Sequence, residues 1–317
     1  MTEYDHEAVI LSAARTPSGR FLGSLSGIPA PKLGAVVVQA AVERAGIKEP
    51  AMIDEVLMGN VVSAGLGQNP ARQAGIFAGL PDSVGATTIN KVCGSGLKTV
   101  MLASQAIRAN DGDLFVAGGM ENMSRVPYMV PGRTGELRYG HAQLTDALLH
   151  DGLWDPFENW GMGDAAEFIA EEYQVSRQSM DELALSSHQK AAAASDNGKF
   201  TAEIVPVDVP GRNGQVSIFN ADETFRRDTS LEALSKLKPV FQKEGKVTAG
   251  NAPGLNDGAA AVVVASRAKA DALGLKPMAR VVGYHQAAVE PKYLFDAPAH
   301  AIPQPVSYTH LRAHETR

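Results

Sequence analysis

The chain has 317 residues, of which 44% are hydrophobic and 20% charged, and its 29 basic and 35 acidic side chains give a formal net charge of -6. This length and composition indicate a folded globular protein with room for two packed domains or one large unit. Since no long run of like charge occurs, we expect no nucleic-acid partner, and an anionic ligand would need a local basic site.

Two further classes of protein are not expected. No apolar stretch approaches the roughly 20 residues that cross a bilayer, and the first residues, MTEYDHEAVILSA, lack the basic-then-apolar order of a signal peptide. We therefore expect a cytoplasmic protein without a membrane partner. The single cysteine, Cys93, excludes an internal disulfide framework and a multi-cysteine metal site, so it is either a small buried apolar residue or a reactive thiol.

The first third of the chain alternates β-rich runs with a helical pattern. The runs at 8–13, 55–62 and 113–119 predict strands, and the segment 31–47 predicts a helix that begins near Pro31 and ends at Gly46. This alternation is typical of a mixed or parallel sheet covered by helices, so the predicted fold class is α/β.

The composition changes over residues 121–243, where methionines, prolines and short polar runs surround one helix predicted at 176–195, with Ser176 as its N-cap. This indicates an inserted, loop-rich subdomain. A β-rich pattern occurs again at 247–266, where a glycine-rich turn leads into a predicted buried strand. The pattern at 279–289 predicts another strand.

The last fifteen residues, PQPVSYTHLRAHETR, have no apolar periodicity and differ in composition from what precedes them. His310 and His314 lie here at i, i+4 spacing, which is half of a metal site. Because no third ligand stands near, we expect no metal and interpret 303–317 as a tail foreign to the fold.

Cys93 lies in the segment TTINKVCGSGLKTVMLASQAIRA. A β-branched run, two glycines and apolar residues at helical spacing predict a strand, a sharp turn and a helix, with the thiol at the helix start. The positive end of a helix dipole favours a thiolate and would lower the pKa of the thiol. Gly94 and Gly96 would admit a large substrate and let backbone N–H groups approach an oxyanion. A buried structural cysteine remains an equal alternative from this segment alone.

The wider sequence resembles the thiolase family, which comprises acetyl-CoA acetyltransferases and 3-ketoacyl-CoA thiolases. The nucleophile of that family lies in the same N-x-x-C-G-S-G segment. The resemblance continues in the family's order through SAARTPSGRFLGSL, GQNPARQAG, GGMENMSRVPY, EIVPVDVPGR and TAGNAPGLNDGAAAVVV, and it runs from about Glu7 to Ile302.

The resemblance implies a five-layered fold, α-β-α-β-α, of two similar halves with a loop domain inserted in the first. It divides this chain into 1–120, the first part of the N-terminal half; 121–243, the inserted domain that contacts coenzyme A (CoA); 244–276, the completion of that half; 277–302, the start of an incomplete second half; and 303–317, the tail.

The resemblance also implies that Cys93 takes the acyl group of an acyl-CoA, after which the carbanion of acetyl-CoA attacks the acyl-enzyme in a Claisen condensation, or the thiolytic reverse. By the same resemblance, three other groups contribute to catalysis in the family: the asparagine of N-E-A-F that holds a water, the histidine of G-H-P that activates the nucleophile, and the second cysteine, in C-x-G-G, that exchanges the α-proton. None of these motifs occurs in this sequence, and we expect neither His285 nor His300 to replace the missing histidine as a base. We interpret the chain as a truncated thiolase and expect at most slow acyl-enzyme formation without condensation.

For CoA, the resemblance implies contacts from Leu153, Met162, Arg226, Phe241 and Ala249. Acyl-CoA and acetyl-CoA are then substrates, no separate cofactor or metal is expected, and the full-length family member is a homodimer or homotetramer. Gly161 and Pro253 stand where many biosynthetic members have a histidine and a serine, and 291–302 departs from M-G-x-G-P, so the acyl chain length stays open.

The roles of two further segments, and two other functions, also stay open. Asn256 and Asp257 are expected to satisfy backbone groups in their turn rather than to do chemistry. GMENMS belongs either to the site and subunit contact or to methionine-rich packing. The alternative functions are a condensing enzyme related to the ketoacyl synthases and a non-catalytic, CoA-binding scaffold whose cysteine is structural.

Overall fold

The computed structural model describes residues 6–130, 132, 137, 139–211 and 214–307. The chain forms two compact units. We call the first the sheet unit, which is made of Met1–Gly152, Thr201–Thr224 and Leu255–Val281, and the second the helical unit, which is made of Leu153–Phe200, Phe225–Gly254 and Val282–Arg317.

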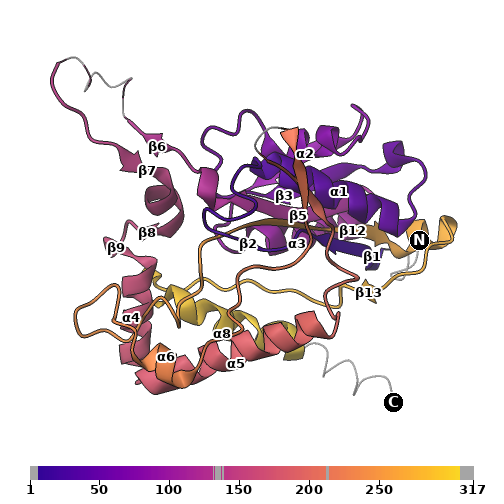
Figure 1. Ribbon diagram of the computed structural model, residues 1–317. Coiled ribbons are helices and arrows are strands. Elements are labelled where there is room, and N and C mark those ends of the chain that lie inside the picture. The colour runs from indigo at the N-terminus through magenta and orange to yellow at the C-terminus, as the bar shows by residue number, and fades with distance from the viewer. Residues whose placement is uncertain (1–5, 131, 133–136, 138, 212–213, 308–317) are drawn as a thin grey trace. The chain divides into compact units, whose positions relative to one another are not determined.

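The sheet unit carries most of the strands (Figure 1). Its strands are β1 (Ala8–Arg15), β2 (Gly19–Arg20), β3 (Glu55–Gly59), β4 (Gly85–Ile89), β5 (Leu114–Asn122), β6 (Tyr128–Met129), β7 (Thr145–Asp146), β10 (Val207–Pro210), β11 (Val216–Phe219), β12 (Asn256–Ser266) and β13 (Ala279–Arg280). Its helices are α1 (Ala30–Ala45), α2 (Pro70–Phe77), α3 (Ser95–Ala109) and α7 (Arg267–Ala272), with the short 3-10 helices η1 (Pro50–Met52) and η2 (Met123–Arg125).

The main sheet is mixed and has the strand order β13-β1-β12-β5-β3-β4, with β2 paired to β12. Strands β3, β4 and β5 are parallel, whereas β12 is antiparallel to both β1 and β5. The pairing of β5 with β12 is long, from Asn122 opposite Asp257 to Leu114 opposite Ala265. Because parallel strands end at one edge of a sheet, the chain segments that follow β3, β4 and β5 meet there.

Alternating side chains of the sheet enter two apolar layers. Val116 and Val263 point to the layer that contains α1 and α2, while Phe115 and Val264 point to the layer that contains α3. This alternation is the period of two that a strand imposes. Both odd and even positions along the strands are apolar, because helices cover both faces of the sheet, as Figure 1 shows for α1 and α3.

The ends of α1 confirm the prediction made from its sequence. Pro31 lies in the first turn, and Gly46 caps the C-terminus in the left-handed conformation with φ of 76°. The N–H of Gly46 donates to Glu43 O, and eleven residues of the helix, which packs against the sheet and α2, are buried.

The predicted strand at 279–289 is wrong in length, because β13 is only Ala279–Arg280. In its antiparallel register Val9 faces Arg280, and Val281 N donates to Ala8 O. Since β1 begins at Ala8, the described part of β1 offers no further ladder partner beyond Val281.

The helical unit contains β8 (Trp154–Asp155), β9 (Trp160–Gly161), α4 (Met162–Glu172), α5 (Arg177–Asp196), α6 (Leu231–Ser235), the 3-10 helix η5 (Pro291–Asp296) and α8 (Ala297–Ala301); a π-helical turn, η3 (Leu148–Leu153), leads into it. Ser176 caps α5 through its hydroxyl, which accepts from Ser179 N, as predicted. Among the described helices, none is both long and apolar enough to span a membrane.

The compact units divide the chain at residues other than the domain boundaries expected from the sequence. Residues 201–224, expected in the inserted domain, are joined to β1, because Arg15 N donates to Glu203 O and the Arg15 guanidinium pairs with Asp222. The five predicted domain ranges concern the halves of a family fold, and they stay predictions.

Candidate active site

Cys93 is exposed and lies between β4 and α3, at the edge where the parallel strands end. The predicted order of strand, turn and helix is therefore confirmed, and the described thiol is not a buried packing residue. No other cysteine exists in the sequence. Exposure makes the thiol available to a substrate that arrives from solvent.

The turn before Cys93 contains a strained residue. Val92 has a φ of 47°, although it is β-branched and 50% exposed. A β-branched residue in the left-handed region is a genuine outlier, which persists only when neighbouring contacts hold it. Ser95 supplies one such contact, because its hydroxyl donates to Val92 O at 2.6 Å and its N–H donates to the same oxygen at 3.1 Å.

The start of α3 lies directly against the sheet because glycines remove the intervening side chains. A Cβ on Gly59 would lie 2.7 Å from Gly96 N, and a Cβ on Gly119 would lie 3.2 Å from Gly96 Cα. Gly59 and Gly119 thus let the helix backbone at Gly96 lie against β3 and β5. The position of α3, and of Cys93 before it, is therefore set by backbone contact, and the expectation that Gly96 admits substrate stays a prediction.

The first turn of α3 has no side-chain cap, and Gly94 occupies the N-cap position with φ of -87° and ψ of 2°. Helix N-termini that lack a side-chain cap leave N–H groups available to an acceptor, and the helix dipole favours negative charge there. Chemically, this end of α3 can stabilise a thiolate or an oxyanion beside Cys93.

A second polar group, Glu121, lies at the same edge, at the end of β5. Its carboxylate accepts from Val61 N at 2.7 Å and from Asn60 Nδ2 at 3.0 Å, with a further backbone bond from Val62. Burial raises the pKa of Glu121, and these donors act in the opposite direction. The segment that follows β3 is therefore tied to β5 by one largely enclosed carboxyl group.

Asp257 satisfies backbone groups, as expected, but in another segment. It lies at the start of β12, opposite Asn122, and accepts from Ser124 N at 3.0 Å and Ser124 Oγ at 2.6 Å. Burial raises the pKa of Asp257. These contacts join β12 to η2, the segment of GMENMS, within the sheet unit.

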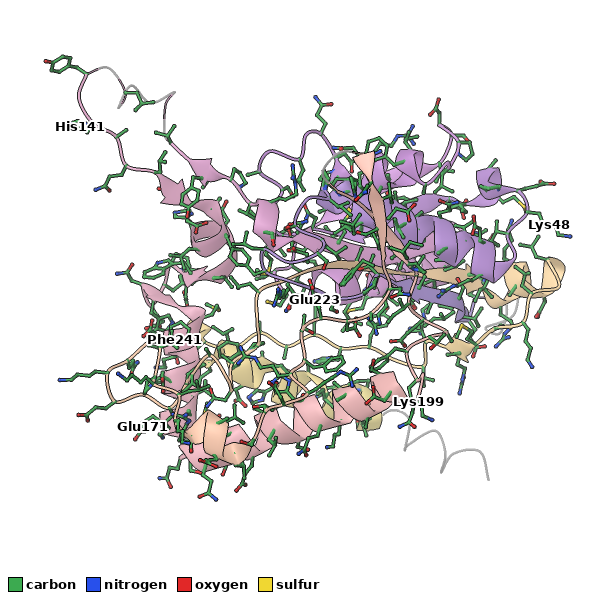
Figure 2. The ribbon with its side chains drawn as sticks, in the orientation of Figure 1. Lys48, His141, Glu171, Lys199, Glu223 and Phe241 are labelled. Atoms are coloured by element: carbon green, nitrogen blue, oxygen red, sulfur yellow. The ribbon has the colours of Figure 1, made fainter. Side chains whose placement is uncertain are left out.

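All five residues expected to contact CoA belong to the helical unit. Leu153 and Met162 are half-buried, whereas Arg226, Phe241 and Ala249 are exposed. The Phe241 ring lies against Gly163 in the first turn of α4, so closely that a Cβ at this glycine would clash with it (Figure 2). The Arg226 N–H donates to His188 Nδ1 at 3.1 Å.

The turn that carries Ala249 is held by buried polar groups. Glu167, buried in α4, accepts from Lys246 N and Val247 N at 2.7 and 2.8 Å. Asn251 closes the turn, since its Oδ1 accepts from Thr248 N at 2.8 Å. The exposed Ala249 is therefore presented on a loop whose backbone is held by hydrogen bonds on both sides.

Comparison with known proteins decides the family. A family model described as "Thiolase, N-terminal domain" matches residues 8–268. The chain belongs to the thiolase family.

Relatives in this family have similar sequences and the same fold. Over 295 residues the chain is 55% identical to an acetyl-CoA acetyltransferase of Cupriavidus necator and 50% identical to a probable acetyl-CoA acetyltransferase of Escherichia coli, in each case with 93% of this chain and 75% of the relative covered. A solved structure of the Bacillus anthracis acetyl-CoA acetyltransferase matches with a TM-score of 0.91 and 40% identity, covering 96% of this chain and 76% of the other. The chain thus spans about three quarters of the length of these thiolases, and its α/β class and thiolase fold are confirmed.

The histidines considered as bases lie outside the sheet unit that contains Cys93. His285 is exposed, and His300 pairs with Asp296 at 2.8 Å, where the Tyr173 hydroxyl also donates. His310 and His314 lie outside the described residues. In the described ranges no cluster of three or more His, Cys, Asp or Glu side chains could hold a metal.

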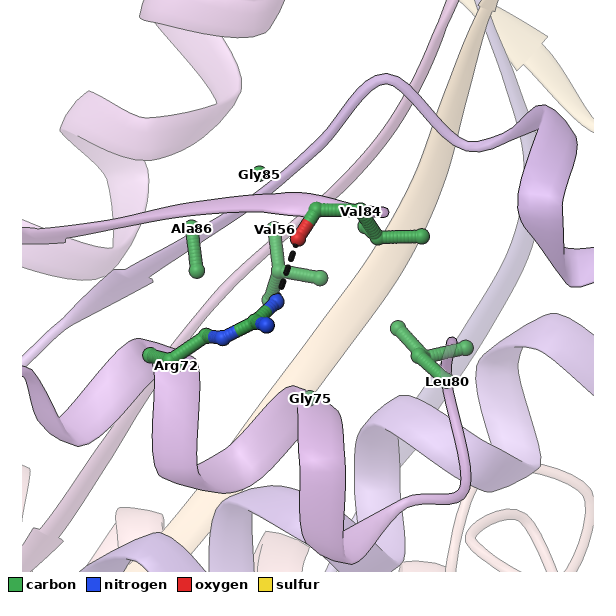
Figure 3. A pocket seen from close by; sticks show the side chains of 7 residues that line it. All are labelled: Val56, Arg72, Gly75, Leu80, Val84, Gly85 and Ala86. Carbon is green, nitrogen blue, oxygen red and sulfur yellow. Dashed lines mark hydrogen bonds between the residues drawn. The ribbon is translucent and has the colours of Figure 1, made fainter. Parts of the chain in front are cut away.

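A small hollow lies between α2, β3 and β4, with an empty volume of about 140 Å³ (Figure 3). Its lining is apolar apart from Arg72, whose Nη1 donates to Val84 O at 2.6 Å. The volume of about 140 Å³ includes open solvent, and the hollow encloses no space that a water molecule could fill. This hollow is therefore too small to hold an acyl-CoA.

In the sequence, Asn90 stood out only as the first residue of the N-x-x-C-G-S-G segment, and Glu121 and Asn60 were not singled out at this edge. Each of them follows or ends a β-rich run: Asn60 follows β3, Asn90 follows β4, and Glu121 is the penultimate residue of β5. Polar residues that end consecutive parallel strands meet at one edge, and this signal could have placed them beside Cys93.

Proposed function

We propose that this thiolase family member is an acyltransferase of the acetyl-CoA acetyltransferase type and that Cys93 is its acyl acceptor. One observation carries the proposal: the exposed thiol lies immediately before the N-terminus of α3, and this N-terminus has no side-chain cap. The chain is 50% to 55% identical to relatives named as acetyl-CoA acetyltransferases, and these names support acetyl-CoA as the substrate.

In the proposed first step, the Cys93 thiolate attacks the carbonyl carbon of an acyl-CoA. The carbonyl electron pair moves to oxygen, where the N–H groups at the start of α3 can bind the developing charge. Collapse of this intermediate expels the CoA thiolate and leaves a thioester on Cys93. A thiol suits this step because one thioester replaces another, so the acyl group can be passed on without a large loss of free energy.

We propose the helical unit as the part that holds CoA, through Leu153, Met162, Arg226, Phe241 and Ala249. The Arg226 guanidinium is permanently charged and planar, so it can pair with phosphate or stack on adenine. The exposed Phe241 ring, fixed against the start of α4, offers an apolar face. CoA thioesters are the substrates here, and the proposal includes no separate cofactor.

We further propose that this polypeptide stops at the acyl-enzyme. Condensation in the family needs a second thiol to exchange the α-proton, by the resemblance described above, and the 317 residues contain one cysteine. Acetoacetyl-CoA formation or thiolysis by the pure polypeptide would contradict this part of the proposal without touching the assignment of Cys93.

Mass spectrometry of the intact chain after incubation with acetyl-CoA tests the proposal. The expected result is the gain of one acetyl group, located on Cys93 by peptide mapping and absent from Cys93→Ser. Arg226→Ala is expected to weaken acetylation, with Arg227→Ala, which removes a neighbouring exposed arginine that pairs with Asp196, as the matched control. A thiol that stays unacetylated by acetyl-CoA and inert to small alkylating reagents would instead favour a non-catalytic scaffold.

We also propose that the chain associates with copies of itself, as a homodimer or homotetramer. Strand β4 lies at the edge of the main sheet, and its residues are exposed or half-buried. An open edge offers backbone N–H and C=O groups to a second strand. Light scattering on eluted peaks tests this: a monomer at every concentration would contradict it.

A further inference from the structure

The segment between β4 and α3 is held from both sides at Val92. Ser95 binds the Val92 carbonyl from the helix side, through two hydrogen bonds of 2.6 and 3.1 Å. Asn90 binds the Val92 amide from the strand side, since Val92 N donates to Asn90 Oδ1 at 3.0 Å. Both peptide groups that flank the strained residue are therefore fixed.

The Asn90 side chain also reaches across to the segment after β3. Its Nδ2 donates to Val61 O at 3.2 Å, so one amide group joins Val61 to Val92. An aspartate here could accept from Val92 N but could not donate to Val61, and an alanine could do neither.

The Val61 peptide is itself anchored. Val61 N donates to the Glu121 carboxylate at 2.7 Å, and Asn60 N donates to Ile89 O at 3.0 Å. A continuous path of hydrogen bonds thus runs from Glu121 at the end of β5, through Val61 and Asn90, to Val92. We call this path the Glu121–Asn90 relay.

Hydrogen bonds from this relay and from Ser95 hold the strain at Val92, because the side chain contributes little to hold it. Val92 is half exposed, so packing does not determine its backbone, and a β-branched residue left free would return to negative φ. Such a return would rotate the peptide between Val92 and Cys93 and turn the thiol away from the start of α3. Strain of this kind, observed first and interpreted afterwards, points to a positioning role.

We propose that Asn90 is a positioning residue for acyl transfer: by holding Val92 at positive φ, it keeps Cys93 at the N-terminus of α3 in the orientation that receives an acyl group. This rests on the proposed function of Cys93. It assigns Asn90 no contact with substrate, and Glu121 acts only as the anchor of Val61.

The test compares two reactions of the same thiol. Acyl transfer from acetyl-CoA depends on the orientation of the thiol, whereas alkylation by iodoacetamide needs only an exposed thiol. For Asn90→Ala we expect acetylation of Cys93 to slow by about ten-fold or more, while the alkylation rate changes by less than about two-fold. Asn90→Asp, which keeps the acceptor for Val92 N, should retain more acetylation than Asn90→Ala.

A second substitution separates positioning from a merely structural role. Glycine adopts positive φ without strain, so Val92→Gly in the Asn90→Ala background should restore part of the lost acetylation. Hydrogen exchange at the Val92 amide gives a readout without CoA, and it should be faster in Asn90→Ala than in the unchanged chain. The urea midpoint of each variant controls for global unfolding.

Three results would overturn the proposal: acetylation of Asn90→Ala at the original rate, an equal fall in acetylation and alkylation that Val92→Gly does not reverse, or unchanged exchange at Val92. If the unchanged chain is not acetylated at all, the proposed function fails by itself. In that case unaltered exchange in Asn90→Ala would also refute the relay, and faster exchange would support it.

Discussion

The interiors of the two compact units differ in the kind of residue that they bury. The sheet unit has two apolar layers, formed by alternating side chains of one sheet. In the described part of the helical unit, four apolar residues are buried, Ala165, Ala170, Leu234 and Val247, beside three buried carboxylates, Asp155, Glu167 and Asp181. Apolar burial thus dominates one unit, and buried carboxylates that bind specific donors are prominent in the other.

Helix α5 shows what this difference means. Of its twenty residues, Asp181 is the buried one, and its carboxylate accepts from Arg177 Nε at 2.8 Å and from Asn251 Nδ2 at 2.9 Å. The Arg177 guanidinium also donates to the carbonyls of Leu234 and Leu237, at 2.7 and 3.1 Å. A helix that buries so little apolar surface depends on these directed bonds for its place, so changes of charge should matter more there than changes of volume.

The largest effect is expected in the apolar layer of α3. Ile107 is 1% exposed and packs among Leu57, Phe115 and Val264, so Ile107→Ala should destabilise the sheet unit by about 3 to 4 kcal/mol through lost burial and a cavity. Urea unfolding measures the change. Leu183→Ala on α5 is the matched control, because Leu183 is 72% exposed and should leave the midpoint unchanged. Equal shifts in both variants would erase the contrast between the units.

A smaller effect should follow in the helical unit when a buried carboxylate is removed. Glu167→Ala leaves the N–H groups of Lys246 and Val247 without their acceptor, which should cost about 2 to 3 kcal/mol and speed their hydrogen exchange. Glu167→Gln, which keeps one acceptor oxygen, should cost less.

Glu171 provides the control for that experiment. It is exposed on the same helix and pairs with Lys246 Nζ at 2.8 Å. Glu171→Gln should leave both the midpoint and the exchange of Lys246 and Val247 unchanged, because an exposed ion pair contributes little. A Glu171 effect as large as that of Glu167 would show that surface charge, rather than buried acceptors, holds this unit.

The smallest effect concerns the ion pair that joins 201–224 to β1. Burial alone would raise the pKa of Asp222, but hydrogen bonds from Arg15 and Ser18 lower it below the ordinary range. A lowered carboxyl pKa contributes stability that is present above about pH 4 and is lost as the pH falls through the folded-state value.

Asp222→Asn should therefore cost about 1 to 2 kcal/mol near neutral pH, and the difference from the unchanged chain should shrink as the pH falls below about 4. Urea midpoints across this range measure it. Asp82→Asn is the control, since that side chain is 96% exposed and lies 3.8 Å from Arg72. A difference for Asp222→Asn that stays constant with pH would contradict the ion-pair explanation.

The sequence predicted the elements whose determinants are local. The Pro and Gly at the ends of α1, the Ser176 cap of α5, and the turn between β4 and α3 are each decided by residues within a few positions, and the structure has them. The motifs also indicated the family, because several separate segments matched thiolase motifs in the same order along the chain.

Other features depend on partners far along the chain and could not be predicted. The close approach of Gly96 to the sheet depends on Gly59 and Gly119, which lie on β3 and β5, in other segments of the chain. Glu121 lies in GMENMS, whose role the sequence left open, and its partner Val61 stands sixty residues earlier. The length of β13 is limited by where β1 begins, which the pattern at 279–289 does not contain.

The presence of one exposed thiol in the whole sequence has a practical consequence. A maleimide fluorophore or spin label would attach at Cys93 alone, with no need to remove other cysteines, and would report on the turn between β4 and α3 directly. The same property is a hazard in storage, because air oxidation can join two copies only through Cys93 and would thereby block the proposed acyl acceptor.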